Sequence, residues 1–174
     1  MNRKFFVSAA FMALLSVTGC ASGRIHEKCY LRAVSVSGNQ LVFSLFNIDG
    51  VIVGTGDDMH SARRSAELIG GKPIFTGYTE LVIVDGEDSL GVLGNMLREW
   101  KLSPSCRVVC SENGEELLRS NDAELLIGIT DQAVKQGIAP PCDIIAVLGE
   151  LCHDGQAETA ELHSDGTVGS CVIR

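Results

Sequence analysis

Apolar and polar residues alternate over two short segments near the start of the chain, residues 31–36 and 41–46. Alternation with a period of two is typical of a β-strand that buries one face. The Ser-Gly-Asn sequence at residues 37–39 has the composition of a tight turn, so the two segments predict a β-hairpin. Residues 81–84 form the unbroken apolar run Leu-Val-Ile-Val, which predicts a strand buried on both faces.

Apolar residues at spacings of three and four predict helices between the strands. Asp57 and Asp58 offer an N-cap and Gly70-Gly71 a stop for a helix over residues 59–69. A capping-box pattern at Asn121 and Glu124 opens a helix that stops at Gly137. Further helices are expected at residues 87–100, 115–119 and 140–151, the last of them starting at Pro140-Pro141.

Two more strands complete the pattern, one at residues 107–109 and one at residues 168–173. The resulting order is β-β-α-β-α-β-α-α-α-β. Strands that alternate with helices belong to the α/β class, and the opening hairpin adds antiparallel strands. The sequence therefore predicts one α/β (α+β-like) domain over residues 31–174, a mixed β-sheet flanked by helices.

The first residues of the chain have the features of a targeting segment. Arg3 and Lys4 precede an apolar run at residues 5–17, which is shorter than the roughly 20 residues of a membrane-spanning helix. The sequence Val-Thr-Gly-Cys at 17–20 matches the bacterial lipobox, whose cysteine receives a diacylglyceryl group and becomes the mature N-terminus. The alternative is an ordinary signal peptide that ends near a cysteine.

We therefore expect residues 1–19 to be a lipoprotein signal peptide, Cys20 to be the lipidation site, and residues 20–30 to form a tether. Two acyl chains, such as palmitate, anchor a protein stably where one chain binds only marginally. The expected location is the extracytoplasmic face of a membrane.

The charge of the chain restricts its partners. Lys and Arg number 14 and Asp and Glu 22, a formal charge of −8, and removal of residues 1–19 takes away two bases and leaves −10. Affinity for a phosphate backbone requires clustered cations, so we expect no nucleic-acid partner. Anionic lipids also repel such a domain, so membrane contact is expected through the lipid or through partner proteins.

The sequence offers little catalytic chemistry. Gly54-Thr55-Gly56 begins like a dinucleotide fingerprint, but position 59 is Met where a third glycine belongs, so a loop bending into the next helix is expected. The histidines stand in no recognisable Cys-His or Ser-His context, and no Gly-x-Ser-x-Gly motif occurs. We expect no catalytic residues and no cofactor. The histidines are His26, His60, His153 and His163.

Six cysteines follow Cys20. Cys106 and Cys110 flank a strand, and four residues of strand rise about 13 Å, too far for a disulfide between them. They are expected on one face as small buried hydrophobes. One or two disulfides among Cys29, Cys142, Cys152 and Cys171 fit an extracytoplasmic setting, with the connectivity open. A zinc site would use Cys106, Cys110, Cys152, His153 or Cys171, but the spacing of a zinc site is missing and no metal is expected.

The order of these motifs resembles a known family. The lipobox cysteine is followed by a strand pair, the Gly54-Thr55-Gly56 loop and a helix containing Ala62, and then by Lys72-Pro-Ile-Phe-Thr-Gly-Tyr-Thr-Glu-Leu-Val-Ile-Val84. This stretch is similar to the lysine, aromatic, glycine, histidine, acidic and apolar signature of the Ger(x)C spore germination lipoproteins, the C subunits of nutrient germinant receptors. Tyr78 stands where the family has histidine, and Ala21 where it has an aromatic residue.

The resemblance covers residues 20–174 and the N-terminal part of the family's length. It implies a non-catalytic subunit or accessory protein of a germinant receptor, anchored through Cys20 in the spore inner membrane and assembled with polytopic membrane subunits. The residues alone leave two alternatives open. One is a generic lipoprotein that binds a small ligand or a cell-wall component, and the other is a thiol-based redox or metal protein.

Overall fold

The structure is a computed structural model that describes residues 27–174. Cys20 and the expected signal peptide lie outside the described residues. Within the described range, no helix is both long enough and apolar enough to span a bilayer.

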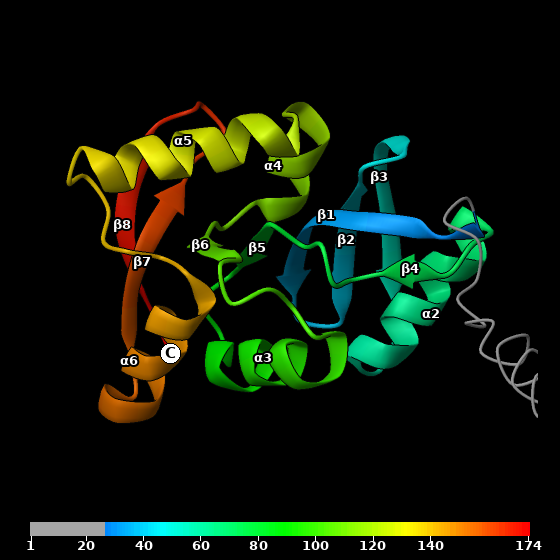
Figure 1. Cartoon of the computed structure of the whole chain (residues 1–174), viewed down its shortest axis with the longest axis horizontal. Coiled ribbons are helices and arrows are strands. Elements are labelled where there is room, and N and C mark those ends of the chain that lie inside the picture. Colours follow the sequence, from blue (N-terminus) through cyan, green and yellow to red (C-terminus); the bar gives the residue numbers. More distant parts are fainter. Residues whose placement is uncertain (1–26) are drawn as a thin grey trace, which may run out of the picture.

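A mixed sheet of eight strands forms the centre of the molecule (Figure 1). Its order is β3-β2-β1-β5-β6-β7-β8, with β4 paired to β1 off this path. Strands β1, β5, β6 and β7 run parallel, whereas β2, β3 and β8 are antiparallel to their neighbours. The strands are β1 (Cys29–Ser37), β2 (Gln40–Leu45), β3 (Ile48–Thr55), β4 (Ile74–Phe75), β5 (Leu81–Val84), β6 (Arg107–Cys110), β7 (Ala157–Leu162) and β8 (Val168–Ile173).

Helices cover both faces of the sheet (Figure 1). Helices α2, α3 and α6 pack with one hydrophobic core, and α4 and α5 pack with a second core on the other face. The helices are α2 (Met59–Gly70), α3 (Ser89–Asn95), α4 (Gly114–Ser120), α5 (Ala123–Lys135) and α6 (Ile144–Asp154), and α3 continues into a π-helical turn η2 (Met96–Trp100). The predicted class, a mixed sheet flanked by helices, is confirmed.

Several local predictions are also confirmed. The hairpin of β1 and β2 turns at Gly38, whose φ of 51° favours glycine. Asp58 caps α2 by accepting from the Ser61 backbone N–H at 2.7 Å. Gly71, with φ 68°, ends that helix in the left-handed region. All four residues of β5 are buried, as the apolar run predicts.

Other boundaries differ from the prediction. Strand β1 begins at Cys29, inside the range expected for the tether. Helix α5 is capped by Asp122, not Asn121, because Asn121 has extended backbone at the end of α4. Helix α6 begins after Asp143, whose side chain accepts from the Ala146 N–H at 3.0 Å, and not at the two prolines.

The structure also contains three strands beyond the predicted ones, β3, β4 and β7. Strand β3 contains Gly50, Gly54 and an aspartate, residues that are depleted in strands. Strand β7 has the sequence Ala-Glu-Thr-Ala-Glu-Leu, which consists mainly of helix formers. Pairing with β6 on one side and β8 on the other makes it a strand, so tertiary contacts override local propensity.

Candidate functional site

The glycine loop after β3 has a structural role in the packing of α2. A Cβ on Gly54 would lie 2.1 Å from the Ala62 carbonyl oxygen, and one on Gly56 would lie 2.3 Å from Ser61 Oγ. Neither glycine has a positive φ. The two glycines are therefore required for the close approach of helix to strand, and not for the bend that the sequence predicts.

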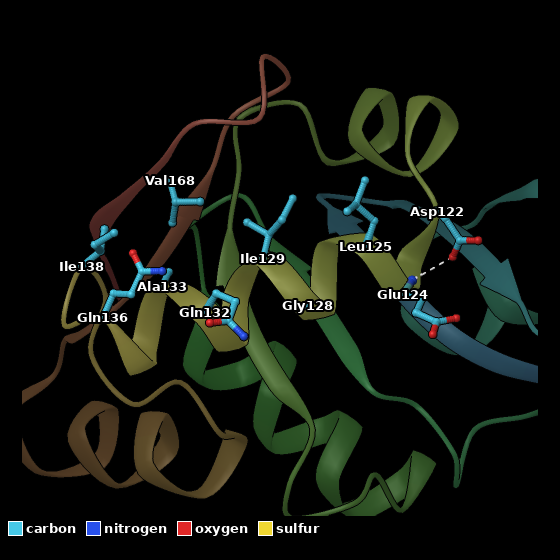
Figure 2. Close-up of a pocket in the computed structure, with 10 residues that line it drawn as sticks. All are labelled: Asp122, Glu124, Leu125, Gly128, Ile129, Gln132, Ala133, Gln136, Ile138 and Val168. Carbon is cyan, nitrogen blue, oxygen red and sulfur yellow. Dashed lines mark hydrogen bonds between the residues drawn. The ribbon is translucent and has the colours of Figure 1, made fainter.

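A hollow with a volume of about 770 Å³ runs along the outer face of α5. Figure 2 shows its lining, which comes from α5, from the loop after α5 and from Val168 at the start of β8. Leu125 and Ile138 are each about half exposed, and Ile129 lies between them along the hollow. The lining residues are Asp122, Glu124, Leu125, Gly128, Ile129, Gln132, Ala133, Gln136, Ile138 and Val168.

The two carboxylates at one end of this hollow already have partners. Asp122 accepts from the Glu124 backbone N–H at 2.8 Å as the cap of α5 (Figure 2). Arg32 on β1 lies 2.9 Å from a Glu124 oxygen and 3.5 Å from an Asp122 oxygen. Hydrogen bonds to Glu124 and Glu80 raise the pKa of Arg32 despite its partial burial. These acids therefore join the first turn of α5 to β1, and the rest of the lining is apolar or amide.

A second ion pair fixes the other end of α5. Arg107 on β6 contacts Asp131 through two guanidinium nitrogens, at 2.9 and 3.2 Å. This bidentate geometry raises the pKa of Arg107, with burial as an opposing effect. Helix α5 is thus tied to the sheet at both ends, while its outer face is left open to solvent.

The cysteines are arranged differently from the prediction. Cys110 forms a disulfide with Cys171, with a Cα–Cα distance of 6.7 Å, so it is not a free buried hydrophobe. Cys106 is free and buried, as expected, and does not pair with Cys110. Of the four cysteines proposed for pairing, Cys171 alone is bonded, and its partner comes from outside that set. Cys29, Cys142 and Cys152 are free.

Burial makes two of the free thiols poor nucleophiles. Desolvation raises the pKa of Cys106 to about 12, against a smaller opposing effect of Arg107. Desolvation also raises the pKa of Cys142 to about 11. Since the thiolate is the reactive form, neither residue has the microenvironment of a redox-active cysteine.

Alkylation of the folded protein at pH 8 should therefore modify Cys152 alone among the free cysteines of residues 27–174. Cys152 is exposed, whereas Cys29, Cys106 and Cys142 are buried. Iodoacetamide labelling followed by peptide mass spectrometry measures this pattern, with labelling in 8 M urea as the control in which all four react. Modification of Cys106 as fast as that of Cys152 would contradict the assigned burial.

Two of the described histidines lie beside carboxylates. The imidazole of His163 lies 3.6 Å from Glu161, and that of His153 lies 3.9 Å from Asp154. His153 is 87% exposed. Across residues 27–174, no three His, Cys, Asp or Glu side chains are grouped so that they could hold a metal ion.

The sequence matches no family model, and comparisons with curated proteins and with solved structures find no match. The residues themselves are therefore the basis for assigning a function. In the described part of the chain they provide an apolar hollow over a firmly held helix. Cys20, the expected lipidation site, lies outside the described residues.

Proposed function

We propose that the protein is a non-catalytic, lipid-anchored subunit or accessory protein of a spore nutrient germinant receptor. In this proposal Cys20 holds the domain on the extracytoplasmic face of the spore inner membrane, and the domain supports germination through contacts with polytopic membrane subunits. The support from sequence is the lipobox together with the motif order that resembles the Ger(x)C lipoproteins.

The open outer face of α5 is the observation that supports a role in protein–protein contacts. Its hollow is lined mainly by apolar and amide groups, and its carboxylates are engaged by Arg32. Apolar surface on a rigid element suits the centre of a protein interface. The Arg32 and Arg107 ion pairs hold α5 against the sheet and so present this surface in one position.

The test is co-purification from detergent-solubilised spore membranes, with the full chain carrying a C-terminal tag. Polytopic receptor subunits should elute with the wild type and be lost with Cys20→Ala. Elution of a lipidated protein alone would refute the receptor assignment.

Within that assay, Leu125→Glu should reduce the co-purified subunits at least about tenfold, because it places a charge on an exposed apolar residue of the hollow. Ile145→Glu is the matched control, since Ile145 is similarly exposed but lies on α6, on the opposite face of the sheet. Equal losses for both variants would indicate a general defect and would contradict a contact through α5.

The hollow along α5 also fits one alternative function. Its volume falls within the range of small-molecule sites, so a lipoprotein that binds a small ligand or a cell-wall component would use these residues as well. A ligand-induced rise in the melting temperature, abolished by Leu125→Glu, would favour this alternative over the receptor subunit.

A further inference from the structure

Exposed apolar side chains gather at one edge of the sheet, where β1 begins. Strand β2 ends at this edge, α2 ends there after running back from β3, and β4 pairs with the first residues of β1 (Figure 1). Half of the large hydrophobic residues that are exposed in the described chain lie in these segments or directly after them. They are Phe46, Leu68, Ile69, Phe75 and Tyr78, and we call them the entry-edge residues.

Hydrogen bonds between the end of α2 and β4 hold one part of the entry-edge residues in place. Glu67 in the last turn of α2 accepts from the Ile74 backbone N–H at 2.9 Å, and Arg63 donates to the Ile74 carbonyl. The end of α2, with Leu68 84% exposed, is thereby held against β4. These apolar residues are therefore presented by ordered elements, not by a loose loop.

Aromatic rings form the other part of the entry-edge residues. Phe75 lies 5.3 Å from Tyr78 and 5.7 Å from Tyr30 between ring centroids, and Tyr30 stacks on Tyr78 at 5.8 Å. The ammonium group of Lys28 lies 5.6 Å from the Phe75 centroid. Tyr78 is 62% exposed in spite of these contacts. Tyrosines with an apolar ring and a polar hydroxyl, next to a lysine, are typical of the membrane–water interface.

The path of the chain places this edge near the proposed anchor. Lys28 follows Cys20 by eight residues, so the tether spans at most about 28 Å when fully extended. A lipid on Cys20 would therefore keep the start of β1, at the entry edge, within about 28 Å of the bilayer.

The acidic residues favour the same orientation. The carboxyl ends of β3, β5 and β6 lie at the opposite edge and are followed by exposed acids. These acids are Asp57, Asp58, Asp85, Glu87, Asp88 and Glu112. At the entry edge, Glu67 is paired with Arg63, and Glu80 with Arg32. Asp122 and Glu124 are exposed there and contact the same Arg32, and Glu27 and Asp49 are exposed there as well. The larger group of acids thus points away from the lipid surface.

We propose that the entry-edge residues rest on the lipid bilayer, so that the domain is oriented by direct contact as well as by its tether. The contact is interfacial, with Phe75 and Tyr78 at the depth of the headgroups and Leu68 and Ile69 beside them. The inference rests on the anchoring at Cys20 that belongs to the proposed function.

Capture on vesicles tests this contact without requiring lipidation. Residues 27–174 contain every described strand and both cores, so the chain from residue 21 carries the whole described domain. An N-terminal histidine tag would hold it on phosphatidylcholine vesicles that contain nickel-chelating lipid and a brominated phosphatidylcholine. Tyr78→Trp is the reporter, and Leu90→Trp is the matched control at the opposite edge; Trp100, which is 5% exposed, gives the same background in both.

The Tyr78→Trp emission should shift to shorter wavelength and be quenched at least about twofold more than that of Leu90→Trp. Equal quenching of both, or quenching of neither, would overturn the proposal. A blue shift of Tyr78→Trp without vesicles, together with a dimer in light scattering, would assign the edge to a second copy and also overturn it. Because the tag replaces the lipid, these outcomes are independent of whether receptor subunits co-purify.

Discussion

Replacement of Gly54 by alanine is expected to lower the free energy of unfolding by about 3 kcal/mol, the upper end of the range for overpacked sites. The added Cβ would lie 2.1 Å from the Ala62 carbonyl oxygen and 3.0 Å from Ala66 Cβ. The first of these atoms is backbone and cannot rotate away, so α2 must move from the sheet. Urea denaturation followed by circular dichroism measures the loss.

Gly149→Ala is the control for this prediction. Gly149 lies within α6, is exposed, and has open space where a Cβ would be added. Alanine is a better helix former than glycine by about 1 kcal/mol, so this variant should be as stable as the wild type or more stable. Similar midpoints of urea denaturation for Gly54→Ala and Gly149→Ala would show that α2 does not need its close approach to β3 at Gly54.

Loss of the Cys110–Cys171 disulfide is expected to cost about 4 kcal/mol, because the bond closes a loop of 61 residues in the unfolded chain. It also joins β6 to the final strand, β8. The double variant Cys110→Ser, Cys171→Ser and the wild type treated with dithiothreitol should both show the lower midpoint in urea.

Cys152→Ser provides the comparison, since Cys152 is exposed and free, and its replacement should change stability by less than about 0.5 kcal/mol. Dithiothreitol should have no further effect on the double variant. If reduction leaves the wild-type midpoint unchanged, the disulfide is absent from the protein as purified. Disulfides form and persist in oxidising compartments, so the presence of this bond in the purified protein would support the proposed extracytoplasmic location.

Local sequence signals were sufficient to predict a turn or a helix end where a single residue determines the backbone conformation. Gly38, Asp58 and Gly71 act through their own conformation or through a neighbour three residues away, and the structure confirms them. Where two similar residues compete, the sequence was ambiguous. Asn121 and Asp122 are both good caps, and the choice of Asp122 coincides with its contact to Arg32 on a distant strand.

Features that depend on distant segments could not be predicted in this way. The partner of Cys171 is determined by the packing of β8 near β6, and no signal in residues 157–162 predicts the strand between them. The hollow along α5 includes Val168, which follows the helix by more than thirty residues. The expected lipobox at residues 17–20 is a pattern of neighbouring residues alone, so its prediction does not depend on the fold and stays a prediction.

The position of β1 in the sheet has a consequence for the order in which the domain folds. β1 pairs with β2 across a two-residue turn, but its other neighbour is distant, since Ala33 pairs with Leu81. The antiparallel strands β1–β3 have only local contacts to form, whereas the parallel half must close long loops and is slower. Cys171 lies in β8, which follows the other described strands in the chain, so the disulfide with Cys110 can form only once β8 is in place. We therefore expect strands β1–β3 to form early and the Cys110–Cys171 disulfide to form last.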